Sequence, residues 1–242
     1  MIEAFGRGRE SLSLSEAADS AGISRASARR LLHTLVRLGY AAFDGKRFML
    51  RPRILGLGSA YLSAAGTWEI ARPFLEELVR ETRESCSASE LDGSEIVHVA
   101  RFPAAHRIMS IAVKVGHRFP AHASAMGRVL LAALPPVELE EYFATAKLRS
   151  LTERTVTDPR LLRAALARAR KQGYAEVDGE LEIGLRSVAV PITDAAGRTL
   201  GAIAISLLSA PASRSKSTAT LLAPMRACAE RIRRALRHTP TR

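Results

Sequence analysis

The sequence predicts a mixed α+β protein, in which a small winged helix-turn-helix domain precedes a larger domain of helices and antiparallel strands. Three observations predict this fold class. Two amphipathic helical patterns joined by a glycine turn occupy residues 14–39, a hairpin pattern occupies residues 40–50, and beyond residue 85 strand-like and helix-like hydrophobic periods alternate. With 242 residues, 47% of them hydrophobic, the chain is long enough for one large core or two smaller ones.

The first helix of the pair is predicted over residues 14–21. Ser13 and Glu16 have the spacing of a capping box, in which each side chain accepts a hydrogen bond from the other residue's amide. Ala21-Gly22-Ile23 then forms a three-residue turn. A winged helix-turn-helix normally has a complete helix ahead of this pair, whereas residues 1–5 have the pattern of only its last turn or two. We therefore expect the first helix to be truncated.

The second helix, predicted over residues 24–39, is the candidate for contact with DNA. Ser24 can cap its start, and Gly39 can end it. Its apolar residues recur at helical spacing and are expected to face inward: Ala28, Leu31, Leu32, Leu35 and Leu38. Polar residues on its other faces are the candidate DNA-binding residues: Ser24, Arg25, Ser27, Arg29, Arg30 and His33.

The wing is predicted over residues 40–50. Apolar residues at 40–43 and 48–50 flank Asp44-Gly45-Lys46-Arg47, and an Asp-Gly pair tolerates the positive φ angles of a tight hairpin turn. Lys46 and Arg47 are expected to contact DNA phosphates, while arginines of the second helix contact base edges in the major groove. Double-stranded DNA with a palindromic operator is therefore the predicted partner. The alternative is an ordinary surface helix with a solvated basic face.

The charge is concentrated at the two ends of the chain. Residues 1–53 contain ten Lys and Arg against five Asp and Glu, residues 54–213 contain 18 of each sign, and residues 214–242 contain eight basic residues against one acidic residue. A basic N-terminal domain fits a polyanionic partner such as DNA. In the tail, the arginines follow a helical pattern, which favours the solvated face of a terminal helix over a second nucleic-acid site.

Several classes of protein are disfavoured by what the sequence lacks. Two cysteines, Cys86 and Cys228, are too few for a disulfide scaffold or a structural zinc cluster. No secretory signal follows Met1, and no apolar run approaches the roughly 18 residues of a membrane span. We therefore expect a cytoplasmic protein with no membrane association.

The rest of the chain predicts a linker and a second domain. Residues 54–62 form an apolar linker helix that is expected to pack on another subunit or domain. The further elements are predicted as a helix at 68–84, strands at 86–91, 95–101 and 108–115, a loop at 116–120, a helix at 124–134, a segment at 137–143, a helix at 159–173, strands at 174–177, 185–190 and 200–207, and a helix at 217–237. The expected domains are the winged helix-turn-helix at 1–52, the linker helix at 53–66, and a mixed α+β domain at 67–242 whose balanced charge suits a small-molecule pocket.

Several side chains of the larger domain could orient an organic anion: His98, Arg101, Arg107, His122, Ser124 and Ser187. Arginine is the natural choice, because its guanidinium binds a carboxylate through two parallel hydrogen bonds. Each residue also has a structural explanation, such as a pairing of Arg101 with Glu95 at a strand end.

Catalysis is not predicted. His117 and His122 lack the i, i+4 spacing of zinc-binding pairs, and the sequence contains neither a Gly-x-Ser-x-Gly elbow nor a glycine-rich phosphate loop. We therefore predict no catalytic residue, no metal site and no cofactor. An architectural DNA-binding protein without a ligand is also disfavoured, since it would not need a neutral domain of about 150 residues.

Three segments of the chain resemble the IclR family of bacterial transcription regulators. They are residues 24–39 together with Leu55-Gly-Leu-Gly-Ser-Ala-Tyr61, residues 122–132, and Gly173-Tyr174 through Glu182–Pro191. The resemblance implies a winged helix-turn-helix joined to a GAF-like α/β effector-binding domain, assembled as homodimers that can pair into tetramers. Within the family, four stretches are most similar to the regulators of protocatechuate, 4-hydroxybenzoate and β-ketoadipate metabolism: residues 84–88, 107–109, 124–128 and 182–191.

The resemblance also implies which residues line an effector pocket over the sheet: Ala125, Met126, Val177, Leu185, Ser187, Ala204 and Ser206. Arg107 and His122 are added as candidates for a small carboxylate effector. Many family members have Cys in place of Ser187 and an acidic residue in place of Val177, so the polarity of this pocket differs from theirs. The expected function is regulation of aromatic-acid catabolism by a carboxylate effector. The alternatives are a regulator of another carbon-source pathway with a non-aromatic effector, and a hydrolase-like enzyme that uses the pocket.

Overall fold

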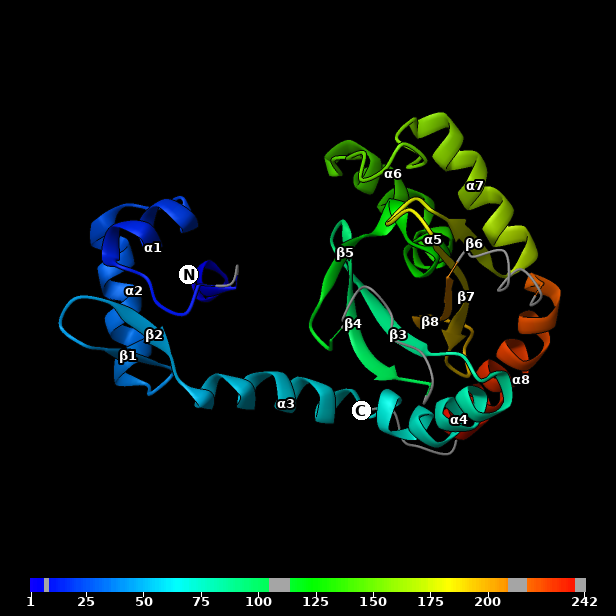
Figure 1. Ribbon diagram of the computed structural model, residues 1–242, viewed down its shortest axis with the longest axis horizontal. Helices are drawn as coiled ribbons and strands as arrows, with labels where there is room; N and C mark the ends of the chain where they lie inside the picture. The colour runs from blue at the N-terminus through cyan, green and yellow to red at the C-terminus, as the bar shows by residue number, and fades with distance from the viewer. Residues whose placement is uncertain (7–8, 105–113, 209–216, 238–242) are drawn as a thin grey trace. The chain divides into compact units, whose positions relative to one another are not determined.

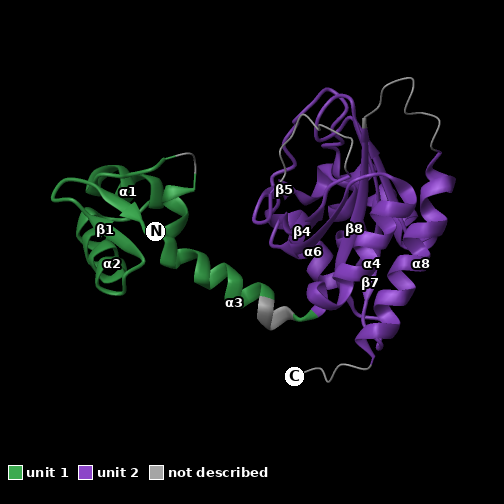
Figure 2. Cartoon of the chain, turned by 60° about the horizontal axis from the view of Figure 1, so that its bottom comes forward, with its two compact units in different colours: residues 1–66 green, residues 67–242 purple. Residues whose placement is uncertain are grey.

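The computed structural model describes residues 1–6, 9–104, 114–208 and 217–237. It divides the chain into two compact units, residues 1–66 and residues 67–242 (Figures 1 and 2). Within the described residues, no helix combines the length and the apolar character needed to cross a membrane.

The first unit is a helix-turn-helix with a two-stranded wing. Its elements are the 3-10 turn η1 (Ile2–Phe5), α1 (Leu14–Ala21), α2 (Arg25–Arg37), β1 (Ala41–Phe43), β2 (Phe48–Leu50), the 3-10 turn η2 (Pro52–Ile54) and α3 (Leu55–Ala65). The strands pair antiparallel, with Phe43 opposite Phe48. The expected remnant of an α-helix at the start of the chain is thus a single 3-10 turn, which contributes Ala4 and Phe5 to the core of this unit.

Local signals in the sequence determine both helices of the pair. The reciprocal capping box of Ser13 and Glu16 starts α1, and Gly22 ends it with a left-handed φ of 63°. The core joins the helices to the wing through Leu12, Leu32 and Phe48. Leu12 was not predicted to take part, but its backbone pairs with Phe48 and adds an isolated antiparallel bridge beside the two strands of the wing.

The expectation that all five apolar residues of the helix predicted over 24–39 face inward is wrong for two of them. Ala28 and Leu32 are fully buried, but Leu31 is 47% exposed and Leu38 is 52% exposed. Successive residues of a helix turn by about 100°, so Leu31 and Leu38 lie on the flank of a narrow buried stripe centred on Ala28 and Leu32. Helix α3 has exposed apolar residues as well, including Leu55 and Tyr61.

The described residues of the second unit form one six-stranded antiparallel sheet with helices around it. Its elements are α4 (Thr67–Thr82), β3 (Cys86–Asp92), β4 (Glu95–Phe102), β5 (Arg118–Pro120), the 3-10 turn η3 (Ala121–Ala123), α5 (Ala125–Ala133), α6 (Pro136–Thr145), α7 (Pro159–Gln172), β6 (Ala175–Asp178), β7 (Leu185–Thr193), β8 (Thr199–Leu208) and α8 (Thr218–Leu236). The strand order is β5-β4-β3-β8-β7-β6. The predicted mixed α+β class is confirmed.

Helices cover both faces of this sheet (Figure 1). Helices α4 and α8 pack together against one face, and α5 packs against the other face, where α7 lies beside it. On the α5 side, the core includes Leu131, Leu162 and Ala204. A close approach fixes α4: the Trp68 ring lies so near Gly201 that a Cβ at this position would be 2.6 Å from it, and the Trp68 indole donates a 2.6 Å hydrogen bond to Glu90.

Two predicted segments between β4 and α5 have different outcomes. The predicted loop at 116–120 was wrong in its second half, since Arg118–Pro120 forms β5 and pairs with Glu95, Ile96 and Val97 of β4. Three residues are too short for a hydrophobic period to indicate a strand. The predicted strand at 108–115 lies outside the described residues, apart from its last two.

Candidate functional site

The start of α2 presents the predicted DNA-binding face. Ser24 caps the helix by accepting a 3.2 Å hydrogen bond from the Ser27 amide, and the two serine hydroxyls are 3.0 Å apart. Arg29 and Arg30 are exposed on the first turns that follow. Amide groups at a helix start carry partial positive charge, and arginines there add to it, so this end of α2 is suited to the anionic surface of DNA.

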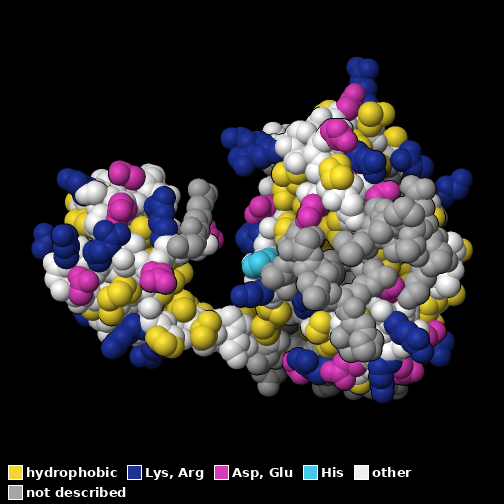
Figure 3. Space-filling view, viewed as in Figure 1, with side chains coloured by type: hydrophobic (Ala, Val, Ile, Leu, Met, Phe, Trp, Pro, Cys, Tyr) yellow, Lys and Arg dark blue, Asp and Glu magenta, His cyan; other side chains and the backbone are white. Residues whose placement is uncertain are grey.

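Arg25 lies on the same exposed face, but its guanidinium also contacts the hydroxyl of Ser15 on α1. This contact connects the two helices of the pair near the surface. Figure 3 shows Lys and Arg side chains, in dark blue, distributed over the visible face of this unit.

The two basic residues predicted for the wing turn, Lys46 and Arg47, have different surroundings. Asp44 folds the turn by accepting hydrogen bonds from the amides of Lys46 and Arg47, at 2.8 and 2.7 Å, and these bonds hold the pKa of its carboxyl below the usual value. Arg47 points back to the body of the unit, where it contacts Ser11 and Glu16. Lys46 is exposed at the turn and is the better placed of the two to meet a phosphate.

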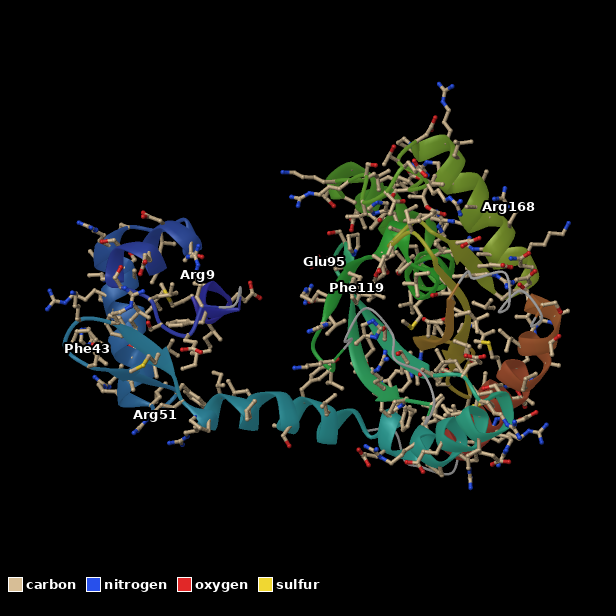
Figure 4. All side chains as sticks on the ribbon, in the orientation of Figure 1. Arg9, Phe43, Arg51, Glu95, Phe119 and Arg168 are labelled. Atoms are coloured by element: carbon tan, nitrogen blue, oxygen red, sulfur yellow. The ribbon has the colours of Figure 1, made fainter. Side chains whose placement is uncertain are left out.

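His33, another predicted DNA-binding residue, contacts aromatic rings of the wing. Its imidazole lies edge-on to Phe43 and Phe48, at centroid distances of 5.7 and 5.6 Å, and the two phenylalanines stack at 4.4 Å. Phe43 is labelled at the hairpin in Figure 4. These contacts join α2 to the wing, and the His33 side chain is exposed, so it stays a candidate for contact with DNA.

In the second unit, a cavity of about 50 Å³ lies between the sheet and the start of α5. Strands β3, β4, β7 and β8 form its floor, and α5 is held over them because Ser124 caps that helix with a 3.0 Å hydrogen bond from the Gly127 amide. Gly127 allows this close packing, since a Cβ there would be 2.1 Å from the Ala121 carbonyl oxygen. Fourteen residues line the cavity: Ser87, Ile96, His98, Arg101, Phe119, Ala123, Ser124, Ala125, Met126, Leu181, Leu185, Ser187, Ala204 and Ser206.

Polar side chains of the mainly apolar lining lie on both sides of β3, which itself contributes Ser87, and Ser124 adds a hydroxyl at the start of α5. On one side, Arg101 of β4 supplies a positive charge. Burial lowers the pKa of its guanidinium, but the ordinary value for arginine is so high that the group stays protonated. On the other side, the Ser187 and Ser206 hydroxyls of β7 and β8 are 3.0 Å apart. Strand β3 lies between β4 and β8, so the backbones of β4 and β8 are separated by two strand spacings, roughly 10 Å.

His98 lies beside Arg101 in this lining and is uncharged near neutral pH. Burial, together with the nearby Arg101 and His117, lowers its pKa to about 4. Its Nδ1 is 3.1 Å from the Ser89 hydroxyl, and its ring is edge-on to Phe119, which Figure 4 labels. The positive charge on this side of the cavity therefore comes from Arg101.

The structure brings together six of the nine residues expected in the pocket: Ala125, Met126, Leu185, Ser187, Ala204 and Ser206. Val177 does not line the cavity, because β6 is the edge strand and its side chain is buried in the core under α5. His122 does not line it either. Its imidazole is fully buried and contacts the Arg149 carbonyl oxygen at 3.0 Å, and burial lowers its pKa. Arg107 lies outside the described residues.

Five lining residues were not anticipated: Ser87, Ile96, Phe119, Ala123 and Leu181. Ser87 could have been found from the register of the predicted hairpin, because it pairs with Arg101 on one side and with Ala204 on the other. Phe119 and Leu181 come from the short strand β5 and from a loop, for which the sequence carries no such signal. Among the described residues, no group of three His, Cys, Asp or Glu side chains is arranged to hold a metal ion.

Two family models match the chain. One, described as the IclR helix-turn-helix domain, matches residues 1–45, and the other, described as the C-terminal domain of the bacterial transcriptional regulator IclR, matches residues 59–234.

Individual relatives agree with these models. The Pca regulon regulatory protein of Pseudomonas putida is 41% identical over 206 residues, covering 85% of this chain and 71% of that protein. The p-hydroxybenzoate hydroxylase transcriptional activator of Acinetobacter baylyi is 37% identical over 207 residues, covering 84% and 76%. A crystal structure of an IclR homolog from Microbacterium hydrocarbonoxydans complexed with 4-hydroxybenzoate is 26% identical, with a TM-score of 0.81 and coverage of 98% of this chain and 96% of that one.

Proposed function

The chain belongs to the IclR family of bacterial transcriptional regulators, and from this membership we propose that it regulates genes of aromatic-acid catabolism in response to a small aromatic carboxylate. Two of the relatives described above are regulators of the Pca regulon and of p-hydroxybenzoate hydroxylase, and a similar structure contains 4-hydroxybenzoate. These relatives are transcriptional regulators and not enzymes. The activity belongs in the cytoplasm, where the operator DNA of a bacterium lies.

The composition of the cavity lining supports an aromatic carboxylate as the effector. An aromatic carboxylate needs a cation for its charge, apolar walls for its ring, and hydrogen-bonding groups for a ring hydroxyl. Arg101 provides the cation, Met126 and Phe119 provide apolar walls, and the pair of Ser187 and Ser206 provides hydroxyls at the far end. Arg107 was one of the candidates for the carboxylate and lies outside the described residues; we assign that role to Arg101, because it lines the cavity.

The tightness of the cavity favours a second candidate. Its volume of about 50 Å³ is far below the roughly 300 Å³ at which typical ligand pockets begin, so a benzene ring enters only if lining side chains move. A compact, non-aromatic acid would require less movement. This observation supports a regulator of a different carbon-source pathway as the alternative.

For the DNA partner, we propose a palindromic operator bound by a dimer, which can pair into a tetramer. The exposed apolar residues of α3, among them Leu55 and Leu57, would gain from contact with a second copy of the chain. In a dimer, the effector can alter operator affinity only by binding the two arrangements of the subunits with different strength.

A thermal-shift screen on the full chain tests the proposal. A ligand at a hundredfold excess over its dissociation constant adds about 2.7 kcal/mol to the free energy of unfolding. We expect 4-hydroxybenzoate or protocatechuate to raise the unfolding temperature and to change the affinity for operator DNA. A shift with non-aromatic acids alone would favour the second candidate, and no shift with either class would contradict a carboxylate effector.

A further inference from the structure

A loop between β6 and β7 contributes directly to the effector cavity. This β6–β7 loop, residues 179–184, begins and ends at glycines with left-handed φ angles, 72° at Gly179 and 84° at Gly184. Its base is closed by a 2.8 Å hydrogen bond from the Gly179 amide to the Leu185 carbonyl. Leu181, in the middle of the loop, lines the cavity.

The neighbouring residue, Glu180, is buried and fixed by charge. Its Oε2 accepts a 2.6 Å hydrogen bond from Arg128 Nη2 and a 2.8 Å hydrogen bond from the Val156 amide. The side chains of Arg128 and Glu180 are only 7% and 9% exposed. The backbone carbonyl of Glu180 accepts a further 2.7 Å hydrogen bond from the Thr155 hydroxyl.

The partner Arg128 belongs to the opposite wall of the same cavity. It lies on α5 two residues after Met126, and its Nε donates a 3.0 Å hydrogen bond to the His122 carbonyl, which fixes the guanidinium on its other side. The Arg128–Glu180 pair therefore joins the α5 wall, which carries Ala125 and Met126, to the loop wall, which carries Leu181.

Stability is a weak reason for such a pair. Removing two charges from water offsets most of their attraction, and apolar replacements of buried ion pairs often leave a protein equally stable. The pair instead determines where the β6–β7 loop lies, because hydrogen bonds from fixed donors to the Glu180 carboxylate allow one position of the loop. This position leaves only about 50 Å³ in the cavity.

We propose that the buried Arg128–Glu180 pair is a positioning device for Leu181, and that Leu181 thereby limits the size of the acid that the effector pocket accepts. The proposal rests on the proposed function for its ligand class. Arg128 and Glu180 do not touch the ligand; they act through the loop. Loss of the pair frees the loop to move between its two glycines and enlarges the pocket.

The test compares full-length variants by calorimetry with 4-hydroxybenzoate and with the bulkier 6-hydroxy-2-naphthoate. Leu181→Ala should reduce the preference for the smaller acid by about tenfold. This is the lower end of the range for the loss of one apolar contact with a pocket wall. Glu180→Gln keeps the shape of the side chain and should reduce the preference in the same direction. Because both changes act through one wall, the double variant should resemble Leu181→Ala alone, not the sum of the two.

A matched control separates positioning from general destabilisation. Glu140→Gln breaks another Arg–Glu pair, the bidentate contact with Arg163 at 2.5 and 2.7 Å, on the exposed surface of α6 and α7. It should leave the preference between the two acids unchanged. The proposal is overturned if Glu180→Gln lowers the unfolding temperature yet leaves that preference unchanged, or if the effects of Glu180→Gln and Leu181→Ala simply add.

Hydrogen exchange gives a readout that needs no ligand, so a failure of the proposed function can be distinguished from a failure of this inference. The amides of Gly179 and Leu185 donate hydrogen bonds at the base and within the loop. They should exchange faster in Glu180→Gln than in the wild-type chain or in Glu140→Gln. Unchanged exchange would show that the ion pair does not hold the loop, whichever acids bind.

Discussion

Arg47 and Glu16 form an ion pair of 2.9 Å that connects the wing turn to helix α1. Arg47 also donates hydrogen bonds to the hydroxyl and the carbonyl of Ser11, at 2.8 and 3.0 Å, next to the point where Leu12 pairs with Phe48. The same Glu16 carboxylate accepts the capping hydrogen bond from the Ser13 amide, and its pKa is lowered chiefly by that bond. One carboxylate thus fixes the start of α1 and the position of the wing.

We predict that Arg47→Ala loosens the wing, whereas Lys46→Ala does not. The Arg47–Glu16 pair is partly exposed and contributes little by itself, but with the two hydrogen bonds to Ser11 the loss should be about 1 kcal/mol. The amides of Leu12 and Phe48 each donate a hydrogen bond to the other residue's carbonyl, and their exchange should accelerate in Arg47→Ala. Equal protection in both variants would mean that Arg47 does not hold the wing.

Lys46→Ala is expected to weaken binding to all DNA sequences alike. Loss of one phosphate contact should reduce the salt dependence of the binding constant by about one counterion, without changing the preference for an operator. Titrations of operator and random duplexes at several salt concentrations measure both quantities. A sequence-dependent loss would place Lys46 at a base and not at a phosphate.

The arginines at the start of α2 are predicted to determine base preference. Arg25→Ala or Arg29→Ala should reduce the difference in binding free energy between operator and random DNA by ~1–3 kcal/mol, if that side chain binds a guanine edge. Arg37→Ala, in the last turn of the same helix, is the matched control and should leave that difference unchanged. If neither Arg25→Ala nor Arg29→Ala reduces the difference in binding free energy between operator and random DNA, α2 is not the recognition helix.

His98 should make the stability of the second unit depend on pH. Its pKa is about 4 in the folded chain, against an ordinary value near 6.5, so folding favours the neutral imidazole. This contribution to the free energy of unfolding is complete above pH 6.5 and is lost as the pH falls from 6.5 toward 4, by roughly 3 kcal/mol in total. Urea unfolding at pH 7 and pH 5 should show a smaller loss for His98→Gln than for the wild-type chain. Equal losses would mean that other groups cause the pH dependence.

Features set by neighbouring residues could be predicted from the sequence. The capping box of Ser13 and Glu16, the cap at Ser24 and the turn at Asp44 all depend on atoms within a few residues, and the structure has each of them. The Asp158 cap and Gly173 end of α7 follow the same rule. Local capping residues and the hydrophobic period were therefore sufficient to predict most helices and the long strands.

Features that depend on distant residues could not be predicted. The pairing of Arg128 with Glu180 spans 52 residues, and nothing in either local sequence indicates it. His122 was expected at the effector, but the carbonyl of Arg149, 27 residues away, satisfies its imidazole. Val177 carries the right alternation for a strand, yet its place on an edge strand under α5 decides that it lies in the core and not at the cavity.

Calorimetry of Arg101→Gln tests the central claim most directly, with Arg118→Gln as the control, because Asp92 and Glu95 hold the Arg118 guanidinium. The wild-type chain should bind 4-hydroxybenzoate well and 4-hydroxybenzamide poorly. Arg101→Gln should lose ~1.5–3 kcal/mol toward the acid, a tenfold or greater rise in the dissociation constant, with little change toward the amide. Equal affinity of the wild-type chain for acid and amide, or unchanged affinity of Arg101→Gln for the acid, would contradict a carboxylate effector held by Arg101.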